Sequence, residues 1–182
     1  MAELTSPILT PARAAALLRA SIATLRAEAA ALGPDGLRWH PAPGEWCVNE
    51  VVGHIIEAER RGFAGRIQLI LEQPGRTLES WDPEQVARER HDCERDGREL
   101  IEELAALRDE SIRLVEELRP KQLELSGEHP QVGTLRIGAL RIIDLLHEWP
   151  HHDRAHVKQA LSIAQAYVWP HMGNAQKFSE ID

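Results

Sequence analysis

The chain has 182 residues, of which 43% are hydrophobic and 27% are charged, with a formal net charge of −8. This length and composition predict one soluble domain over residues 1–182 with a full core. No cluster of arginine or lysine stands free of carboxylates, which argues against nucleic acid as a partner. No apolar run approaches the ~20 residues that cross a bilayer, and the first residues lack a secretion signal, so we expect a cytoplasmic protein with no membrane partner.

Helical periodicity predicts two long helices in the first half of the chain. Thr10 is a good N-cap and Pro11 suits the first helical position, so the first helix covers residues 11–32 and ends at Gly33. Residues 33–46 form a predicted loop. A second helix covers residues 48–72, with an apolar face that runs its whole length.

The second half predicts a short helix and two more long ones. Asp82 and Pro83 start a short amphipathic helix over residues 83–91, and a long helix covers residues 96–118. Residues 121–133 are predicted to be irregular, and the last helix begins near Thr134. Pro150 lies inside this last pattern and predicts a kink or a restart of the helix. Four long helices with long connections and a short extra helix predict an all-α four-helix bundle with long crossovers.

Histidines cluster on the last predicted helix. Residues four apart share one face of a helix, so the spacing gives two pairs that can bind one ion, His147/His151 and His152/His156. Imidazole is a common ligand of zinc, nickel and iron. Neither pair lies at the centre of the apolar stripe, so the pattern leaves both open. His54, alone in an apolar helical segment, is the candidate third ligand.

Other residues carry weaker signals. The lone histidines are more often surface or core residues than ligands; they are His40, His91, His129 and His171. Cys47 and Cys93 are far apart and predict reduced thiols rather than a disulfide. The aromatic segment of residues 167–172 is expected to cover the bundle or a dimer face. A glycine-rich phosphate loop, a GxSxG motif and an HExxH motif are absent from the sequence.

Two separated motifs resemble a known family. Trp39-x-Pro41, followed by the stretch from Pro43 to His54 (PGEWCVNEVVGH), is similar to the "W-x-P…G-E-W-S" signature of the DinB-like (YfiT/DinB) superfamily of metal-dependent four-helix-bundle proteins. His152-Asp153-Arg154-Ala155-His156-Val157-Lys158-Gln159 resembles its "H-x-x-x-H-x-x-Q" ending. The resemblance covers nearly the whole chain and implies the four-helix bundle.

The resemblance also implies a metal site. Its ligands would be His54, His152 and His156, holding a divalent ion, zinc or nickel, with His147 and His151 as neighbours. This chain has Cys47 where the family usually has serine or threonine, and Cys47 as a fourth ligand is the less favoured alternative. Glu50 and Glu57 flank His54, so either carboxylate can orient its ring or act as a base on bound water, with Glu57 as the candidate base. The favoured interpretation is that both are solvated carboxylates on the helix surface. Asp153 is expected at the surface.

The family implies two enzymatic functions and leaves a third possibility. The first is transfer of a low-molecular-weight thiol, of the bacillithiol or mycothiol type, to an electrophile, with the metal activating the sulfur. The second is metal-dependent hydrolysis of a small amide or ester, with the metal activating water. The third is a non-catalytic, stress-related bundle. Bundles of this type are often homodimers, which we expect here.

Overall fold

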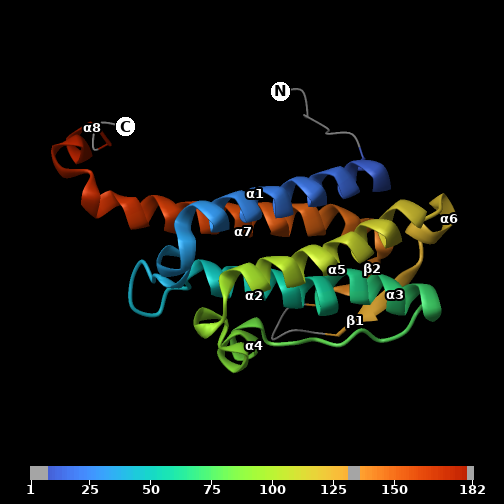
Figure 1. The fold of residues 1–182 in the computed structure, drawn as a ribbon. Coiled ribbons are helices and arrows are strands. Elements are labelled where there is room, and N and C mark those ends of the chain that lie inside the picture. Colours follow the sequence, from blue (N-terminus) through green and yellow to red (C-terminus); the bar gives the residue numbers. More distant parts are fainter. Residues whose placement is uncertain (1–7, 131–135, 180–182) are drawn as a thin grey trace, which may run out of the picture.

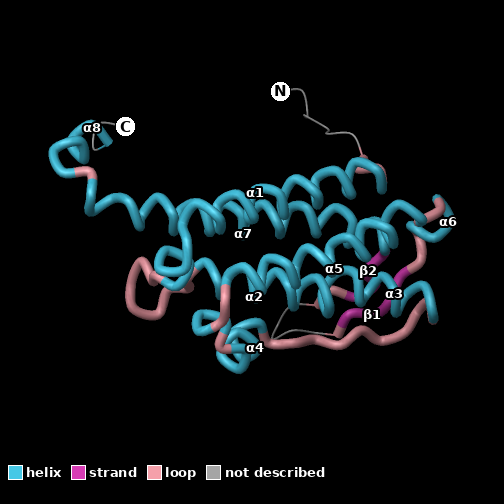
Figure 2. Tube along the Cα trace, viewed as in Figure 1, coloured by secondary structure: helices cyan, strands magenta, loops and turns pink. Residues whose placement is uncertain are grey.

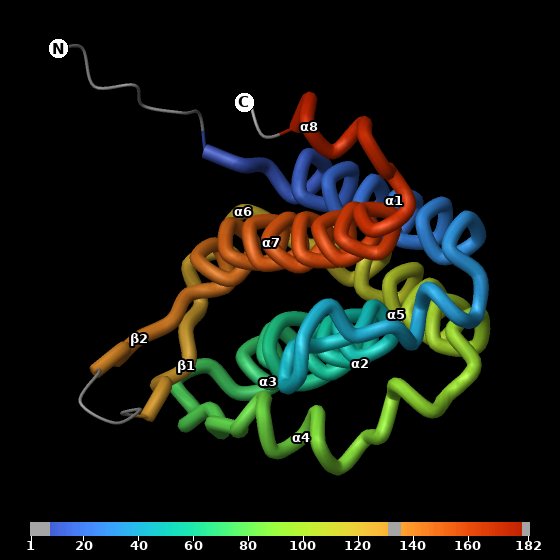
Figure 3. Tube along the Cα trace, turned by 90° about the vertical axis from the view of Figure 1, so that its left-hand side faces the viewer, coloured from blue at the N-terminus to red at the C-terminus, as the bar shows by residue number. Residues whose placement is uncertain are grey.

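Four long helical segments form a bundle in the computed structural model, which describes residues 8–130 and 136–179 (Figure 1). These segments are α1 (Pro11–Arg38), the continuous rod of α2 (Val48–Glu57), η1 (Ala58–Phe63) and α3 (Ala64–Glu72), α5 (Gly97–Glu117), and α7 (Ile142–Val168). α1 packs against both α5 and α7, and α2 packs against α5 and α7. Figure 3 looks along this arrangement and shows α1 and α7 above the rod of α2 and α3. The predicted four-helix bundle is confirmed.

Short elements connect or extend the rods (Figure 2). They are α4 (Pro83–Arg90), η2 (Asp92–Glu94), α6 (Pro120–Leu123), β1 (Ser126–His129), β2 (Gly138–Arg141), η3 (Trp169–His171), η4 (Gly173–Ala175) and α8 (Gln176–Ser179). Three connections join the rods: residues 39–47 before α2, residues 73–96 with α4 and η2, and residues 118–141 with α6, β1 and β2. The first two meet near the start of α2, where Nε2 of His40 lies 3.2 Å from the sulfur of Cys93.

Capping side chains begin the helices where the sequence predicts. Thr10 accepts the backbone N–H of Arg13 at the start of α1, and Asp82 and Asp96 cap α4 and α5 in the same way. Gly33 adopts a φ of 65° that breaks α1, as predicted. The chain then resumes a helical turn to Arg38, where the sequence predicted a loop.

The second rod contains a π-helical segment, η1, between α2 and α3. At the end of this segment the carbonyl oxygen of Arg60 occupies the space that a Cβ on residue 65 would need. Residue 65 is therefore a glycine, and its missing side chain lets the wider turn close. Such turns are frequent at functional sites because they re-aim the side chains around them.

Three predictions for the second half of the chain are wrong. Residues 121–133 were predicted irregular, yet α6 and β1 lie there, and β1 pairs antiparallel with β2, with Ser126 opposite Arg141. The last helix begins at Ile142 instead of near Thr134, which lies outside the described residues. The strands have four residues each, too few for an alternating pattern to stand out. α7 also continues through Pro150, so a restart there is wrong.

The apolar core forms two clusters separated by polar residues. One cluster contains the N-terminal part of α7 together with α3, and the other contains the C-terminal part of α7 together with α2. In α7, the first apolar cluster ends at Trp149 and the second begins at Val157. His152, Asp153 and His156 lie between them in the sequence. In α5, Arg108 falls between the two sets in the same way. A polar layer therefore crosses the middle of the bundle.

The C-terminal segment after α7 leaves the bundle (Figure 1). Tyr167 packs edge-on against Trp39, whereas Phe178 is 77% exposed. Of the aromatic segment of residues 167–172, Tyr167 at the end of α7 therefore covers the bundle. Within residues 8–130 and 136–179, no helix combines the length and apolarity that crossing a membrane requires.

Candidate metal centre

Three histidines converge in the polar layer. His54 comes from α2, and His152 and His156 come from successive turns of α7. The Nε2 atoms of His54 and His152 are 3.1 Å apart, and potential ligand atoms of all three side chains lie within 4.8 Å of one another. The ring of His156 is 4.4 Å from each of the other two rings, centroid to centroid. These are the three residues that the sequence named.

The other α7 pair does not join this cluster. Nε2 of His147 accepts the backbone N–H of Leu9 at 3.0 Å, and its Nδ1–H donates to the carbonyl of Ile143 at 2.7 Å. His151 is exposed. Both ring nitrogens of His147 are thus used, and its bond to Leu9 holds the residues before α1 against α7, so His147 has a structural role.

Aromatic rings surround the cluster and keep it from being charged. Trp46 and Trp81 lie 5.3 and 6.0 Å from His54, and Phe63 lies 5.2 Å from His152, between ring centroids. Burial, aided by repulsion among the histidines, lowers the pKa of His54 to about 3 and that of His152 to about 4. Both rings are therefore neutral at neutral pH, the form in which imidazole binds a metal.

The hydrogen bonds of the cluster fit a divalent ion. Gln159 accepts the Nδ1–H of His156 at 2.9 Å, which leaves Nε2 of His156 available as a ligand. The buried Nδ1 atoms of His54 and His152 have no partner among the described residues. Two neutral imidazoles whose Nε2 atoms face each other can share only one proton, whereas an ion accepts both lone pairs. Gln159 is the last residue of the H-x-x-x-H-x-x-Q motif, but the sequence analysis did not predict its hydrogen bond to His156.

A buried ion-pair network lies next to the cluster. Arg108 donates to Asp153 at 2.5 Å and is 2.9 Å from Glu59, and each of the three residues is at most 2% exposed. Trp149 donates its indole N–H to the same Glu59 carboxylate at 3.2 Å. The prediction that Asp153 lies at the surface is wrong, because Arg108 from α5 stabilises it inside the bundle. One arginine faces two carboxylates, and burial raises the pKa of Glu59 to about 7.

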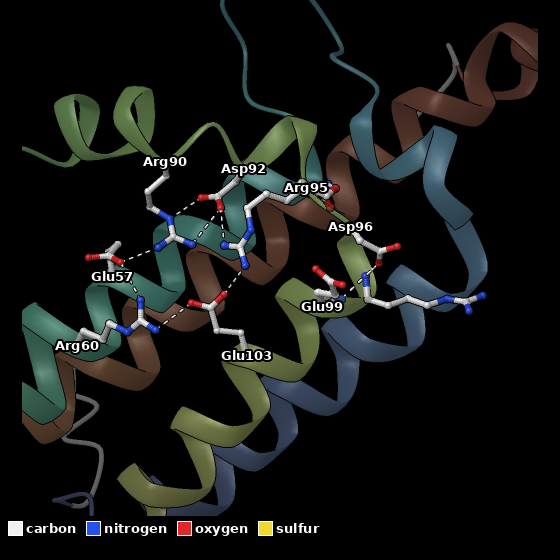
Figure 4. A network of polar contacts seen from close by, with 10 residues as sticks. Glu57, Arg60, Arg90, Asp92, Arg95, Asp96, Glu99 and Glu103 are labelled. Carbon is white, nitrogen blue, oxygen red and sulfur yellow. Dashed lines mark hydrogen bonds and ion pairs between the residues drawn. The ribbon is translucent and has the colours of Figure 1, made fainter.

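Glu57 belongs to a separate network of charges (Figure 4). Its carboxylate accepts from Arg90 at 2.7 Å and also pairs with Arg60 and Arg61. These arginines outweigh the effect of burial and lower the pKa of Glu57, which weakens it as a base. The candidate base of the sequence analysis is therefore held by arginines, and it lies outside the group of potential metal ligands.

The same network continues to Asp92, which pairs with Arg90 and Arg95 (Figure 4). Gly53, next to His54, allows this close approach, because a Cβ there would overlap the Asp92 carboxylate. The chain between α4 and α5 is thus tied directly to the helix that carries His54.

Glu50 and Cys47 lie outside the histidine cluster. Glu50 accepts the backbone N–H of Cys47 at 2.8 Å and so caps the start of α2. Cys47 is buried beside Cys93, and burial raises the pKa of its thiol. The structure groups Cys47 with His40, Glu50 and Cys93 instead of with the three histidines.

An open cavity of about 250 Å³ reaches the histidine cluster. Its lining is Gly44, Glu45, Trp46, Glu84, His156 and Gln159. His156 is therefore the histidine that a small molecule in this cavity would meet. Trp81, on the other side of His54, lines a second cavity of about 460 Å³ with several arginines.

The lowered pKa values predict how acid affects the metal-free protein. The unfolded chain binds protons at His54 and His152 below about pH 6.5, whereas the folded chain binds them only near pH 3 to 4. These two residues therefore make stability fall as pH drops from about 6.5 to about 3, and add no pH dependence above that window. Glu59 acts in the opposite direction, because its folded pKa is raised.

The measurement is the melting temperature of chelator-treated protein across this pH window. Wild type is compared with the His54→Ala, His152→Ala double variant, because the comparison cancels Glu59 and the other carboxylates. We expect the variant to lose less stability than wild type on acidification. If the melting temperature falls equally with pH in both proteins, His54 and His152 are not the residues that destabilise the folded chain in acid.

Known proteins share this arrangement of helices. The family model of the DinB superfamily matches residues 16–160 of the chain. Among curated proteins no match was found. The solved structure of YfiT from Bacillus subtilis, described as a probable metal-dependent hydrolase with an unusual four-helix bundle topology, matches with a TM-score of 0.78 and 15% identity, over 93% of this chain and 94% of that chain. At this identity the likeness to YfiT concerns the fold.

Proposed function

The chain belongs to the DinB superfamily, and from its histidine cluster we propose that it is a metal-dependent enzyme that transfers a low-molecular-weight thiol to an electrophile. The observation that carries the proposal is the convergence of His54, His152 and His156 beside an open cavity. Three ligands with a free position suit catalysis better than a closed structural site. Zinc and nickel are the proposed ions.

The chain's own residues prepare the site for such an ion. Burial keeps His54 and His152 neutral, and Gln159 fixes the ring of His156 through its Nδ1–H. Trp46 and Phe63 restrict water around the cluster. A divalent ion bound there would supply Lewis acidity, which lowers the pKa of a thiol or of water.

The surroundings of the cluster favour a thiol as nucleophile. Among the described residues, the buried carboxylates next to the cluster are already paired with arginine: Glu57 with Arg90, and Glu59 and Asp153 with Arg108. A free thiol has a pKa of about 8.5, whereas that of bulk water is about 15.7. A thiol therefore needs much less help to become an anion, and its activation does not require the arginine-paired carboxylates to act as bases.

Hydrolysis of a small amide or ester is the second candidate. Glu84 lines the same cavity as His156, where its carboxylate has access to water beside the cluster. The description of YfiT as a probable metal-dependent hydrolase supports this candidate through the shared fold. Glu84→Gln would reduce hydrolysis and leave thiol transfer unchanged.

One assay distinguishes the candidates. Protein loaded with zinc or nickel is incubated with chromogenic electrophiles, with and without small thiols, and separately with chromogenic esters and amides. Turnover that requires the thiol supports the transferase, and ester or amide turnover without thiol supports the hydrolase. Loaded protein that turns over neither would identify a non-catalytic bundle. His156→Ala should lose turnover, and the exposed His171→Ala serves as the control.

A further inference from the structure

A second group of potential ligands lies at the start of α2, where the connection that follows α1 meets the connection that carries η2. It consists of His40 from the connection after α1, Cys47 and Glu50 from the start of α2, and Cys93 from η2. One potential ligand atom of each side chain lies within 4.8 Å of those of the other three. Cys47 is seven residues before His54, about 10 Å along the helix. The two groups share no residue.

His40 is oriented as a ligand. Its Nδ1–H donates to the carbonyl of Glu45 at 2.7 Å, because a carbonyl only accepts. The proton on Nδ1 leaves the Nε2 lone pair free, and Nε2 lies 3.2 Å from the sulfur of Cys93. Metal-binding histidines are typically held by such a bond from the other ring nitrogen. A side chain that was only filling the surface would need no such orientation.

The remaining donors match one ion. Two sulfurs, one imidazole nitrogen and one carboxylate oxygen are all ligands of tetrahedral zinc, in which neighbouring ligand atoms lie about 3.3 to 3.8 Å apart. The measured separation of Nε2 of His40 and Sγ of Cys93 is already close to this range. Oε2 of Glu50, which accepts the backbone N–H of Cys47, lies 3.7 Å from Nδ1 of His40, so the Glu50 carboxylate borders the group. The start of α2 also favours negative charge, such as that of two thiolates and a carboxylate.

We propose that His40, Cys47 and Cys93 bind a structural zinc ion, with Glu50 as the fourth ligand. The ion would tie three segments together: the connection after α1, the start of α2 and the turn before α5. Trp46, next to Cys47, packs on the ring of His54. The clasp, meaning these four residues and their ion, therefore fixes one wall of the histidine cluster. It is independent of the proposed enzymatic function.

Cobalt(II) binding tests the clasp directly. Cobalt bound to thiolate absorbs strongly in the near ultraviolet through charge transfer from sulfur, and cobalt bound only by histidine does not. The His152→Ala, His156→Ala double variant removes the histidine cluster and keeps the clasp. We expect chelator-treated, reduced double variant to bind about one cobalt ion with this absorption, and zinc to displace it. This result would stand even if the histidine cluster binds nothing.

Matched variants locate the ligands. Cys47→Ser and Cys93→Ser, each in the double-variant background, should lose most of the charge-transfer absorption, and His40→Ala should weaken cobalt binding at least tenfold. The exposed His91→Ala is the control and should bind as the background does. Circular dichroism of each variant establishes that it is folded.

Two results would overturn the proposal. One is a folded double variant with both thiols free by thiol titration and no charge-transfer absorption at saturating cobalt. The other is a Cys47–Cys93 disulfide that persists in protein purified under reducing conditions, because the sulfurs would then be unable to bind an ion.

Discussion

Replacing His152 by alanine is expected to abolish stoichiometric metal binding while the bundle stays folded. Nε2 of His152 faces that of His54 at 3.1 Å, so the substitution removes one of three converging ligands. Loss of a residue that only supports a ligand costs about 10- to 100-fold in metal affinity. Loss of a ligand should cost more. The side chain is only partly buried and belongs to neither apolar cluster, so its removal leaves most of the core packing in place.

The adjacent His151→Ala provides a matched control. It lies on the same turn of α7, has the same chemistry and is exposed. Metal content is measured in protein purified without a histidine tag, and affinity is measured by titration of chelator-treated protein. In both measurements the clasp is blocked by Cys47→Ser and Cys93→Ser. Equal metal content in His152→Ala and His151→Ala would show that these histidines do not hold the ion, and the enzymatic proposal would fail with it.

The largest effect on stability is expected from Arg108→Met. Arg108 is 1% exposed and is the cation that faces Glu59 and Asp153, both equally buried. Breaking a buried ion pair by removing one partner typically costs about 3 to 5 kcal/mol, because a charge remains without compensation. Methionine has a similar length, so the loss of packing is small. We expect the free energy of unfolding to fall by an amount within that range.

Urea unfolding of metal-free protein measures this loss. Arg113→Met, at an exposed position of the same helix, controls for the change in composition. A triple variant with Arg108→Met, Glu59→Gln and Asp153→Asn removes the charges together and should recover part of the stability. If the free energies of unfolding of Arg108→Met and Arg113→Met differ by less than about 1 kcal/mol, the network is not the charge-compensated unit described above.

The starts of α1, α4 and α5 were predictable because they depend on local chemistry. Thr10, Asp82 and Asp96 are capping residues that act on the next turn, and their positions mark helix starts in the structure. The bundle followed from the apolar stripes between these caps. The strands β1 and β2 were missed because each is short and is defined by its partner across a connection that the sequence pattern does not reveal.

The three histidines were predicted from the family resemblance, because spacing alone left His147 and His151 equally open, while the surroundings of the cluster depend on contacts across the bundle. His152 and His156 share a face of α7 by their spacing, but only the fold brings His54 to them. Asp153 was misplaced because an ideal helix wheel does not show that Arg108, forty-five residues earlier, lies inside the bundle. Glu57 was a plausible base by its distance from His54 in sequence, and its arginine partners come from α4 and η1.

The polar layer between the two apolar clusters has a thermodynamic consequence. Each cluster covers one half of the bundle, and the layer where His152 and Arg108 lie joins them. A ligand that binds only the folded layer stabilises the folded chain by mass action, in proportion to the logarithm of its concentration. Because both halves border the layer, such a ligand would favour their joint folding. Metal supply would then control not only chemistry but how cooperatively the protein unfolds.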